Sequence, residues 1–417
     1  MEGTTIPVKT YVEGRNCGAL ERVPSVPPMV ALLTGGFDRP YAFGLAMAMA
    51  SKAVPLDVIG SDEVDSPEMH STPGLNFLNM QGNPREGVSP VRRVWKVLTF
   101  YVRLIRYASI AKPKIFHILW NNKIQLFDRT LLMLYYKLLG KKIVFTAHNV
   151  NAGKRDAKDS LLNRLTLRIQ YQLADHIFVH TEAMKSELLE EYGIRKGRVT
   201  VIPFGINNAV PNTELTPAEA KRQLGIGNEE KTVLFFGAIR PYKGLEYLVA
   251  AFQRVASEHQ GYRLIIAGEP KKEAMQYLND ILETIEKHPS RGQVTRKIEF
   301  ISDAETELYF KAADVLALPY TQIFQSGVLF LAYSFGLPVI AADVGSFRDD
   351  IIPGNTGYLF RPCDAVDLAT TIKTYFESDL FKTLDGRRQD IRDFAHARNS
   401  WDVVGERTRS VYERLEK

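Results

Sequence analysis

The sequence predicts an α/β protein of two domains, each built on a doubly wound parallel sheet. Three observations lead to this fold class. The chain has 417 residues, too many for one ordinary hydrophobic core. Short apolar runs alternate with helical patterns, which is the order of elements in a parallel sheet covered by helices. A polar, proline-containing stretch over residues 207–217 separates two halves of similar size and is the expected linker.

In the first half, apolar runs predict six strands with helices between them. One apolar-rich helix follows Gly35-Gly36, and another is expected over residues 159–174. Residues 61–90 are rich in Ser, Pro, Gly and Asn, so we expect a long loop there. Residues 1–27 are mixed in composition, and we expect a loose arm. The expected strands are residues 29–34, 56–60, 115–120, 142–147, 176–181 and 199–205.

The second half continues the alternation without repeating the sequence of the first. Ser326 is expected to cap a helix that begins at Gly327. Residues 354–360 are predicted to form a tight connection, and the chain is predicted to be helical from Ala365 to its end. The expected strands are residues 233–236, 262–270 (ending at Gly268-Glu269), 297–302, 314–320 and 339–342. Two such domains facing each other form a cleft bounded by strand ends.

Charge is distributed unevenly. Residues 1–205 carry 27 Lys/Arg and 18 Asp/Glu, whereas residues 206–417 carry 26 and 30. A basic front half indicates that the first domain meets an anionic partner. The two cysteines, Cys17 and Cys363, belong to no CxxC pair, so the sequence indicates a reducing compartment and no zinc site. The N-terminal residues contain no secretory h-region, and no run reaches the ~18 apolar residues of a spanning helix.

The stretch TVLFFGAIRPYKG, residues 232–244, is predicted to bind an anion. It begins as a buried strand, turns at Gly237, and places Arg240 and Lys243 just before an amphipathic helix. A helix N-terminus offers unpaired N–H groups, and the two cations suit a phosphate. The alternative is a solvated basic loop between strand and helix.

Two polar sites follow strands of the first half. Gly35 and Gly36 come directly after a buried strand and let a ligand approach the backbone, or they form only a tight turn. His148 and Asn149 follow the strand 142–147, where open α/β sheets place ligand groups. The alternative for His148 is a histidine satisfied by local hydrogen bonds.

Residues 91–114 form a predicted basic amphipathic helix. Its cations Arg92, Lys96, Arg103 and Arg106 fall within about 80° of one another on a helical wheel. Trp95 lies near the boundary, and the opposite side is apolar. This composition is typical of a helix that lies on an anionic membrane. The alternative is a surface helix whose apolar side packs on its own sheet. The expected apolar side comprises Val94, Leu98, Tyr101, Leu104, Ile105 and Ala108.

The ordered segments resemble glycosyltransferase family 4. FFGAIRPYKGLEYLVAAF, LIIAGEP, DVLALPY and SGVLFLAYSFGLPVIAADVGSFRDDI resemble the C-terminal domain of that family, and LLTGG, VFTAHNV, FVHT and VIPFGI its N-terminal domain. The resemblance spans roughly residues 30–400. It implies a GT-B fold of two Rossmann-like domains: an acceptor domain over residues 1–205, a donor domain over 206–395, and a C-terminal helix over 396–417 that packs back on the first domain.

The resemblance also assigns site residues. Arg240 and Lys243 match the family's cations for the donor diphosphate, and Gly237 matches the turn before them. Glu269 falls in the acidic position near the nucleotide. His148 matches the histidine near the transferred sugar, and with the two cations it makes up the expected catalytic set. The remaining donor-binding positions are Gly35, Gly36, Ser326, Gly327 and Val328.

Two departures from the family pattern stand out. Ala238 occupies the position after the first glycine, where the family usually has Arg. Ile323 and Leu331 occupy the positions of two glutamates that hold the donor sugar and the ribose in the family. Gln322 and Gln325 are polar neighbours that could substitute, although a neutral amide is a weaker acceptor than a carboxylate.

The leading expectation is a metal-independent, retaining hexosyltransferase. It would move a sugar from a UDP- or GDP-sugar to a polysaccharide or lipid-linked saccharide, with the nucleotide-sugar as co-substrate and no further cofactor. Two alternatives are a transferase-like protein that binds without catalysis and a nucleotide-sugar epimerase of the same fold. We expect a cytoplasmic protein, peripheral at the inner face of the membrane through residues 91–114. Nucleic-acid binding is not expected, because no nucleic-acid module is present.

Overall fold

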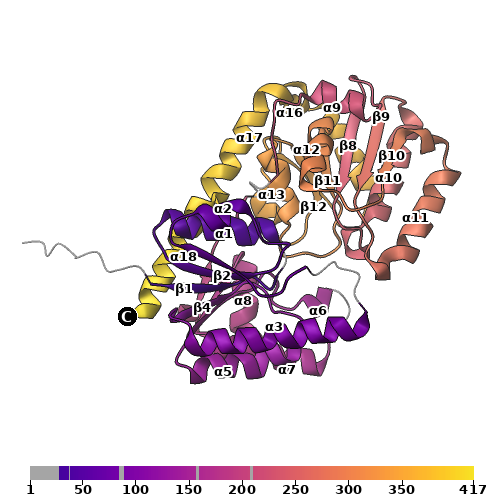
Figure 1. The fold of residues 1–417 in the computed structure, drawn as a ribbon. Helices are drawn as coiled ribbons and strands as arrows, with labels where there is room; N and C mark the ends of the chain where they lie inside the picture. Colours follow the sequence, from indigo (N-terminus) through magenta and orange to yellow (C-terminus); the bar gives the residue numbers. More distant parts are fainter. Residues whose placement is uncertain (1–27, 37, 84–88, 156–158, 207–209) are drawn as a thin grey trace, which may run out of the picture.

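The computed structural model describes residues 28–36, 38–83, 89–155, 159–206 and 210–417. The predicted N-terminal arm, with Cys17, and part of the predicted linker lie outside these ranges. The described residues form two α/β domains, each with its own parallel sheet, and the second domain lies above the first in Figure 1. The predicted fold class is confirmed.

The first sheet has seven parallel strands in the order β3-β2-β1-β4-β5-β6-β7. The order reverses direction after β1, so helices cover both faces, as expected of a doubly wound sheet. Its inner strands are fully buried, which explains their continuous apolar runs. The strands are β1 (Val30–Leu33), β2 (Leu56–Gly60), β3 (Leu75–Asn79), β4 (Ile115–Ile118), β5 (Lys142–Thr146), β6 (His176–Val179) and β7 (Val199–Val201).

Two groups of helices cover the two faces of the first sheet. On one face α1 and α18 pack in a core that contains Leu32, Tyr41 and Tyr412. On the other face α3, α5, α7 and α8 pack around Phe116 and Phe145. The helices with residues from the first half are α1 (Arg39–Ser51), α2 (Pro67–Ser71), α3 (Pro90–Ile110), α4 (Gln125–Phe127), the π-helical turn η1 (Asp128–Leu132), α5 (Met133–Leu138), α6 (Ala152–Arg155), α7 (Leu161–Leu173) and α8 (Glu182–Glu190).

The second sheet has six parallel strands in the order β10-β9-β8-β11-β12-β13. Strand β8, which leads into the predicted anion site, lies between β9 and β11 near the middle of the sheet. This position brings its carboxyl end next to the loops that follow β9 and β11. The strands are β8 (Lys231–Phe236), β9 (Tyr262–Ala267), β10 (Val294–Lys297), β11 (Val315–Leu318), β12 (Val339–Ala342) and β13 (Gly357–Phe360).

Helices also cover both faces of the second sheet, with one core cluster on each side. The chain then crosses back: α17 packs against α13 of the second domain, whereas α18 packs against α1 of the first. The helices are α9 (Pro217–Gln223), α10 (Leu245–Glu258), α11 (Met275–Lys287), α12 (Asp303–Ala312), α13 (Gly327–Ser334), α14 (Phe347–Asp350), α15 (Ala365–Glu377), α16 (Asp379–Lys382), α17 (Leu384–Asn399) and α18 (Trp401–Glu416).

Trp401, the first residue of α18, fixes this crossing. Its indole Nε1 donates to the carbonyl of Ile206, 2.7 Å away. A Cβ atom at Gly44 of α1 would lie 2.0 Å from the indole, and one at Gly205 would lie 2.5 Å from it. Both glycines are therefore required by the close approach of the ring. The end of the chain thus belongs physically to the first domain.

Three secondary-structure predictions were wrong. The predicted loop over residues 61–90 contains α2 and the edge strand β3, whose sequence LNFLN has two polar residues among five. The strand predicted at 297–302 is β10, at residues 294–297, a polar edge strand with the sequence VTRK. The predicted tight connection at 354–360 contains β13, which pairs with β12. Strands β3 and β10 lie at sheet edges and mix polar with apolar residues, so they lack the continuous apolar run that identified the central strands. Strand β13 does have a short apolar run, GYLF, but it directly follows the turn residues GNT.

Candidate functional site

The turn after β8 brings together three elements of the second domain. Gly237 has φ 97°, and a Cβ atom there would lie 3.2 Å from the Nζ of Lys243 and 3.8 Å from a methyl carbon of Val328. Lys243 ends a short 3-10 turn, Pro241–Lys243, and is 7% exposed. Its ammonium also lies 5.5 Å from the ring centroid of Tyr320, a favourable cation–π distance. A buried cation therefore lies between the end of β8 and the first turn of α13.

Two further predicted residues adjoin this turn. Gly268 follows β9, and a Cβ atom on it would lie 2.1 Å from the carbonyl oxygen of Gly237, so only glycine fits. Glu269 comes next, and its carboxylate is 3.5 Å from the ammonium of Lys271. Arg240 directly precedes the 3-10 turn and is half-buried. All the predicted diphosphate residues of the β8 turn thus lie at the carboxyl edge of the second sheet.

The N-terminus of α13 differs from the prediction in one detail. Ser326 does stand at the N-cap position, but its side chain accepts no capping hydrogen bond from the helix. Its φ and ψ of −127° and 117° are extended, as usual for an N-cap, and the residue is only 4% exposed. The N–H of Leu329 donates to the backbone carbonyl of Ser326 at 3.2 Å, but the serine side chain satisfies none of the first N–H groups of α13. Such groups form an anion-binding end of a helix.

Aliphatic side chains fill the two positions where family members have glutamates. Leu331 is 6% exposed within the core of the second domain, and Ile323 packs on the same core. A carboxylate at position 331 would therefore be buried, whereas position 323 is partly exposed. The amide oxygen of Gln325 is buried and has no hydrogen-bond partner among the described residues. Because buried polar atoms nearly always have a partner, the amide oxygen of Gln325 is a candidate acceptor for a ligand hydroxyl.

In the first domain, His148 lies in an aromatic cluster at the end of β5. Its ring stacks on Trp120 at 4.1 Å between centroids and 3° between planes. Tyr41 of α1 meets the same ring edge-on, with centroids 4.6 Å apart. The ring centroid of Phe204 lies 6.3 Å from that of His148. Phe204 also contacts the second domain, because its ring stacks on Phe330 of α13 with centroids 5.9 Å apart. The histidine and the first turns of α13 thus lie on two sides of one phenylalanine.

A second histidine, His180, sets the tautomer of His148. The Nδ1 of His180 is 3.2 Å from the carbonyl oxygen of Ile202, which can only accept, so this nitrogen carries the proton. The Nε2 of His180 is then an acceptor for the Nδ1–H of His148, 3.0 Å away. His148 consequently presents an unprotonated Nε2, which is buried and has no partner within the described parts of the chain. This assignment follows from the hydrogen-bond network.

Burial keeps both imidazoles neutral. Desolvation lowers the pKa of His180 to about 4. Desolvation, followed by repulsion from His180, lowers the pKa of His148 well below its ordinary value. His148 is therefore a hydrogen-bond acceptor at neutral pH and not a cation.

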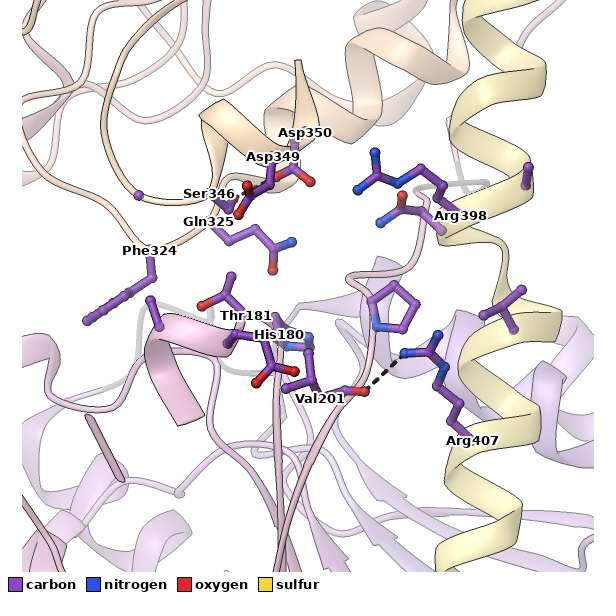
Figure 2. Close-up of a pocket in the computed structure, with 17 residues that line it drawn as sticks. His180, Thr181, Val201, Phe324, Gln325, Ser346, Asp349, Asp350, Arg398 and Arg407 are labelled. Carbon is purple, nitrogen blue, oxygen red and sulfur yellow. Dashed lines mark hydrogen bonds between the residues drawn. The ribbon is translucent and has the colours of Figure 1, made fainter. Parts of the chain in front are cut away.

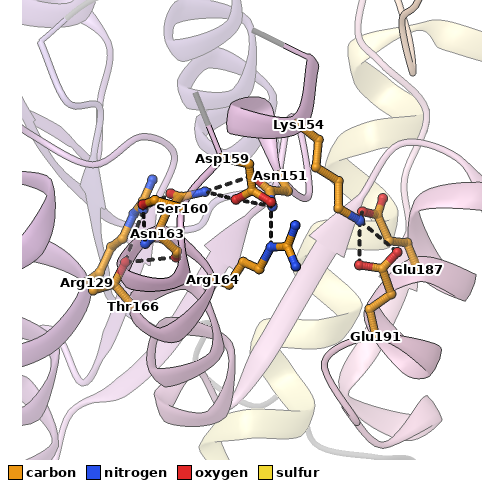
Figure 3. A network of polar contacts seen from close by, with 10 residues as sticks. All are labelled: Arg129, Asn151, Lys154, Asp159, Ser160, Asn163, Arg164, Thr166, Glu187 and Glu191. Atoms are coloured by element: carbon orange, nitrogen blue, oxygen red, sulfur yellow. Dashed lines mark hydrogen bonds and ion pairs between the residues drawn. The ribbon is translucent and has the colours of Figure 1, made fainter. Parts of the chain in front are cut away.

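A polar network holds the segment that follows His148 (Figure 3). Asp159 accepts hydrogen bonds from the side-chain amides of Asn151 and Asn163 at 3.1 and 2.9 Å. The bond from Asn163, then the bond from Arg164, lowers the pKa of Asp159 to about 2. The hydroxyl of Tyr171 donates to the carbonyl of Val150 at 2.5 Å. These contacts tie the β5–α6 connection to α7, so the strand end that carries His148 is fixed in place.

The glycine-rich turn after β1 lies beside the same cluster. Gly35 and Gly36 have φ angles of 68° and 81°. A Cβ atom at Gly35 would lie 2.8 Å from the Cβ of Trp120, and one at Gly36 would lie 2.2 Å from the amide of Gln81. The turn is therefore tight and also lies against the ring on which His148 stacks.

A cavity of 440 Å³ lies between the domains next to His180 (Figure 2). His180 and Thr181 line it from the first domain, Gln325 and Asp350 from the second, and Arg398 from α17. Burial raises the pKa of Asp350 to about 6, although the hydroxyl of Ser346 donates to it at 2.6 Å. The cavity therefore contains donors and acceptors from both domains, as expected for a polar ligand.

His180, Tyr41 and Phe204 were missed in the sequence. His180 could have been found by the same rule as His148, because it follows β6 directly at the carboxyl edge of the sheet. Tyr41 and Phe204 carry no comparable pattern, since their contacts come from the tertiary packing. No group of three or more His, Cys, Asp or Glu side chains with metal-site geometry occurs in the described part of the chain.

Two family models and several known proteins match this chain. Residues 39–210 match the family model described as Glycosyltransferase Family 4, and residues 230–378 match that described as Glycosyl transferases group 1. A relative named D-inositol 3-phosphate glycosyltransferase, from Corynebacterium diphtheriae, is 25% identical over 391 residues, covering 89% of this chain and 88% of the relative. The protein of the same name from Nocardia farcinica is 24% identical over 396 residues, covering 88% and 82%.

Solved structures share the fold. A sucrose-phosphate synthase from Thermosynechococcus elongatus superposes with a TM-score of 0.73 at 20% identity, covering 93% of this chain and 99% of that one. HepE from Anabaena, solved with UDP and glucose, has a TM-score of 0.72 at 17% identity, covering 93% and 100%. The same Anabaena protein has also been solved with UDP-glucose. These likenesses confirm the predicted two-domain architecture.

Proposed function

Because this chain belongs to glycosyltransferase family 4 and has the GT-B fold, we propose that it transfers a hexose from a UDP- or GDP-sugar with retention of configuration. The acceptor is a polysaccharide or a lipid-linked saccharide, and no metal ion takes part. The observation that carries the proposal is the convergence of Gly237, Lys243 and the first turn of α13. A buried cation beside helix N–H groups that Ser326 does not cap suits a diphosphate.

The residues of the second domain stabilise the leaving group. As the bond to the sugar breaks, negative charge accumulates on the diphosphate. In this proposal, Arg240, Lys243 and the backbone N–H groups of Gly327 and Val328 lower the energy of that charge. Because Lys243 is already buried, its ammonium needs little reorganisation when the diphosphate arrives.

The residues of the first domain orient the sugar. The unprotonated Nε2 of His148 accepts a hydrogen bond from a donor hydroxyl once the ligand repositions the surrounding rings. The amide of Gln325 receives a second hydroxyl in place of the missing glutamate. Gly35 and Gly36 allow the donor and acceptor to approach the backbone. No carboxylate is assigned as a nucleophile, since Ile323 and Leu331 occupy the two acidic positions of the family.

The test is a panel of nucleotide-sugars. Thermal shift with UDP, GDP and their hexose derivatives identifies the donor, because a ligand that binds the native state raises its melting temperature. UDP-glucose is the first choice, since it is the ligand of the Anabaena structure. Transfer is then measured with saccharide acceptors and with D-inositol 3-phosphate, the acceptor named in the relatives. If no nucleotide raises the melting temperature, the proposal is wrong.

The same assay distinguishes the two alternatives. A transferase-like protein without catalysis binds a nucleotide but gives neither transfer nor donor hydrolysis, and the loss of both family glutamates motivates this alternative. An epimerase converts the nucleotide-sugar with no acceptor present. Product analysis with and without acceptor therefore separates the three activities.

A further inference from the structure

One layer of the first domain carries most of the exposed apolar side chains. Nineteen large apolar side chains are exposed among the described residues, and fifteen of them fall between Val91 and Leu165. They lie on α3, on the continuous helical stretch from α4 through η1 to α5 with its two flanking residues Ile124 and Leu139, and on α7. These helices lie together at the lower edge of Figure 1, away from the second domain. The distribution is too uneven for apolar side chains scattered at random over a surface.

The inner sides of these helices account for the core, so the outer side chains have no role in it. Tyr101 of α3, Tyr136 of α5 and Tyr171 of α7 belong to one core cluster against the sheet. The hydroxyl of Tyr101 donates to Asp128 at 2.9 Å and joins α3 to the next helix. The outer sides nevertheless stay apolar. The exposed fractions include Trp95 66%, Val102 66%, Leu131 62%, Leu138 78% and Leu161 85%.

The beginning of α3 shows the strongest exposure of side chains in this layer. From Pro90 to Thr99 no side chain is buried, although this stretch contains Val91, Val94, Trp95 and Leu98. The sequence predicts Val94 and Leu98 on the apolar side of the helix, but they are 58% and 48% exposed. Packing on its own sheet therefore does not explain the first half of this helix.

The same layer is strongly basic. Residues 90–142 contain twelve Lys and Arg but only one acidic residue, Asp128, which is buried. Arg92, Arg93, Arg103 and Arg106 of α3 are all exposed. Exposed apolar and cationic side chains on one surface are typical of elements that lie in a membrane interface.

We propose that the outer sides of α3, of residues 125–138 and of α7, here named the basic apolar face, lie on the surface of an anionic lipid bilayer. This face is wider than the single helix over residues 91–114 that the sequence predicts. Charge complementarity favours an anionic bilayer over a second copy of this chain as the partner of the face. A second copy would place the same excess of positive charge against itself, whereas anionic headgroups neutralise it and the acyl boundary receives the apolar side chains.

The geometry keeps the cleft available while the face is occupied. The basic apolar face covers one side of the first sheet, whereas His148, Gly35 and Gly36 lie at the carboxyl edge of its strands. Bilayer binding would have a functional consequence only if the proposed function is correct: a transferase bound to the bilayer meets a saccharide carried on a membrane lipid. The inference rests on the proposed function for this consequence alone. Binding to the bilayer itself requires no activity.

The test is sedimentation of the full chain with vesicles. Phosphatidylcholine vesicles are compared with vesicles that contain 30–40 mol% phosphatidylglycerol, a range of about one anionic lipid in three chosen to give a strong surface potential. We expect binding to the anionic vesicles at low salt and its loss at high salt, because exposed charges are screened. Trp95 should shift to shorter emission wavelength on binding, while the partly buried Trp120 and Trp401 change little.

Two pairs of variants test the two components of the face. Trp95→Ser with Leu98→Ser removes apolar contacts, and Met275→Ser with Phe300→Ser removes similarly exposed side chains from the second domain as a control.

Arg103→Glu with Arg106→Glu reverses two charges on the face. The control, Lys287→Glu with Lys382→Glu, reverses two exposed charges of the second domain, so both double variants have the same net charge. Because each cation near an anionic surface contributes about fivefold to partitioning, we expect the charge variant on the face to lose at least about 25-fold in binding and its control little.

Several outcomes would overturn the proposal. These are equal binding to neutral and anionic vesicles, equal effects of the face and control variants, or a salt-dependent dimer with no vesicle binding, which would assign the face to a second copy. Vesicle binding is measured without a nucleotide, and nucleotide binding without vesicles. A failure of this proposal is therefore distinguishable from a failure of the proposed transferase activity.

Discussion

Replacing Lys243 by Met tests the central contact of the proposed donor site. Met keeps most of the aliphatic side chain, which is 7% exposed, and removes only the ammonium group. The ammonium lies beside Gly237 and the ring of Tyr320. The substitution therefore changes the charge of the site far more than its shape.

The expected magnitude follows from the burial of the ammonium. A hydrogen bond to a charged group contributes about 1.5–3 kcal/mol. This range corresponds to a loss of between about 10-fold and about 150-fold in the affinity for a nucleoside diphosphate. We expect the upper part of the range, because a site shielded from water screens the attraction between ammonium and phosphate less than an exposed one. A nucleoside without phosphates should bind equally well to both forms.

The assay is calorimetric titration with UDP, GDP and the corresponding nucleosides. Lys287→Met, at an exposed position on α11, is the matched control for loss of one positive charge. Circular dichroism and thermal unfolding verify that the variant is folded. Unchanged affinity of Lys243→Met for whichever diphosphate binds the parent protein would refute the assigned role.

Three further predictions concern buried polar groups. His180→Ala should lower kcat for transfer by roughly 10- to 100-fold through misorientation of His148 and leave UDP affinity unchanged, whereas His180→Gln, which keeps an acceptor, should lower kcat less. Lys221→Met leaves the carboxylate of Asp314, 2.9 Å away and largely buried, without its cation, and should lower the free energy of unfolding in urea by about 3–5 kcal/mol. Burial lowers the pKa of His117 to about 3, so its contribution to stability is present above the unfolded pKa of about 6.5 and is lost as pH falls toward 3. His117→Gln should therefore lose about 2 kcal/mol less than the parent protein between pH 7 and pH 5.

Each of these predictions has a contradicting result. Equal kcat for the Ala and Gln variants of His180 would mean that the tautomer of His148 does not matter. A loss below about 1 kcal/mol in Lys221→Met would show that water reaches the Asp314 carboxylate, because surface ion pairs have that value. Parallel pH profiles for His117→Gln and the parent protein would mean that His117 is protonated in the native state.

The central strands and the β8 turn were predictable because local chemistry determines them. Strand β8 is a continuous apolar run that ends at Gly237, and this turn requires positive φ. Strands β3 and β10 were not predictable in the same way. Their sequences mix polar and apolar residues, and each pairs with a single strand at the edge of its sheet, so tertiary context decides their conformation.

The candidate site shows the same division. His148 and the glycines at positions 35 and 36 were identified because they follow buried strands. The function of His180 depends on a carbonyl at Ile202 and a ring at position 148, neither of which is near it in sequence. The helix over residues 91–114 was identified by its periodicity, but the wider face required the exposed side chains of α5 and α7.

The return of α18 to the first domain has a consequence during synthesis. Tyr412 hydrogen-bonds to His117 at 2.5 Å and, with Val404 and Val411, covers a face of the first sheet. These residues leave the ribosome only after the whole second domain has been synthesised. The apolar surface of the first domain therefore stays exposed, and open to chaperones, until α18 has been translated. Ribosomes that stall before Trp401 would release a chain in which the second domain can fold and the first cannot be completed.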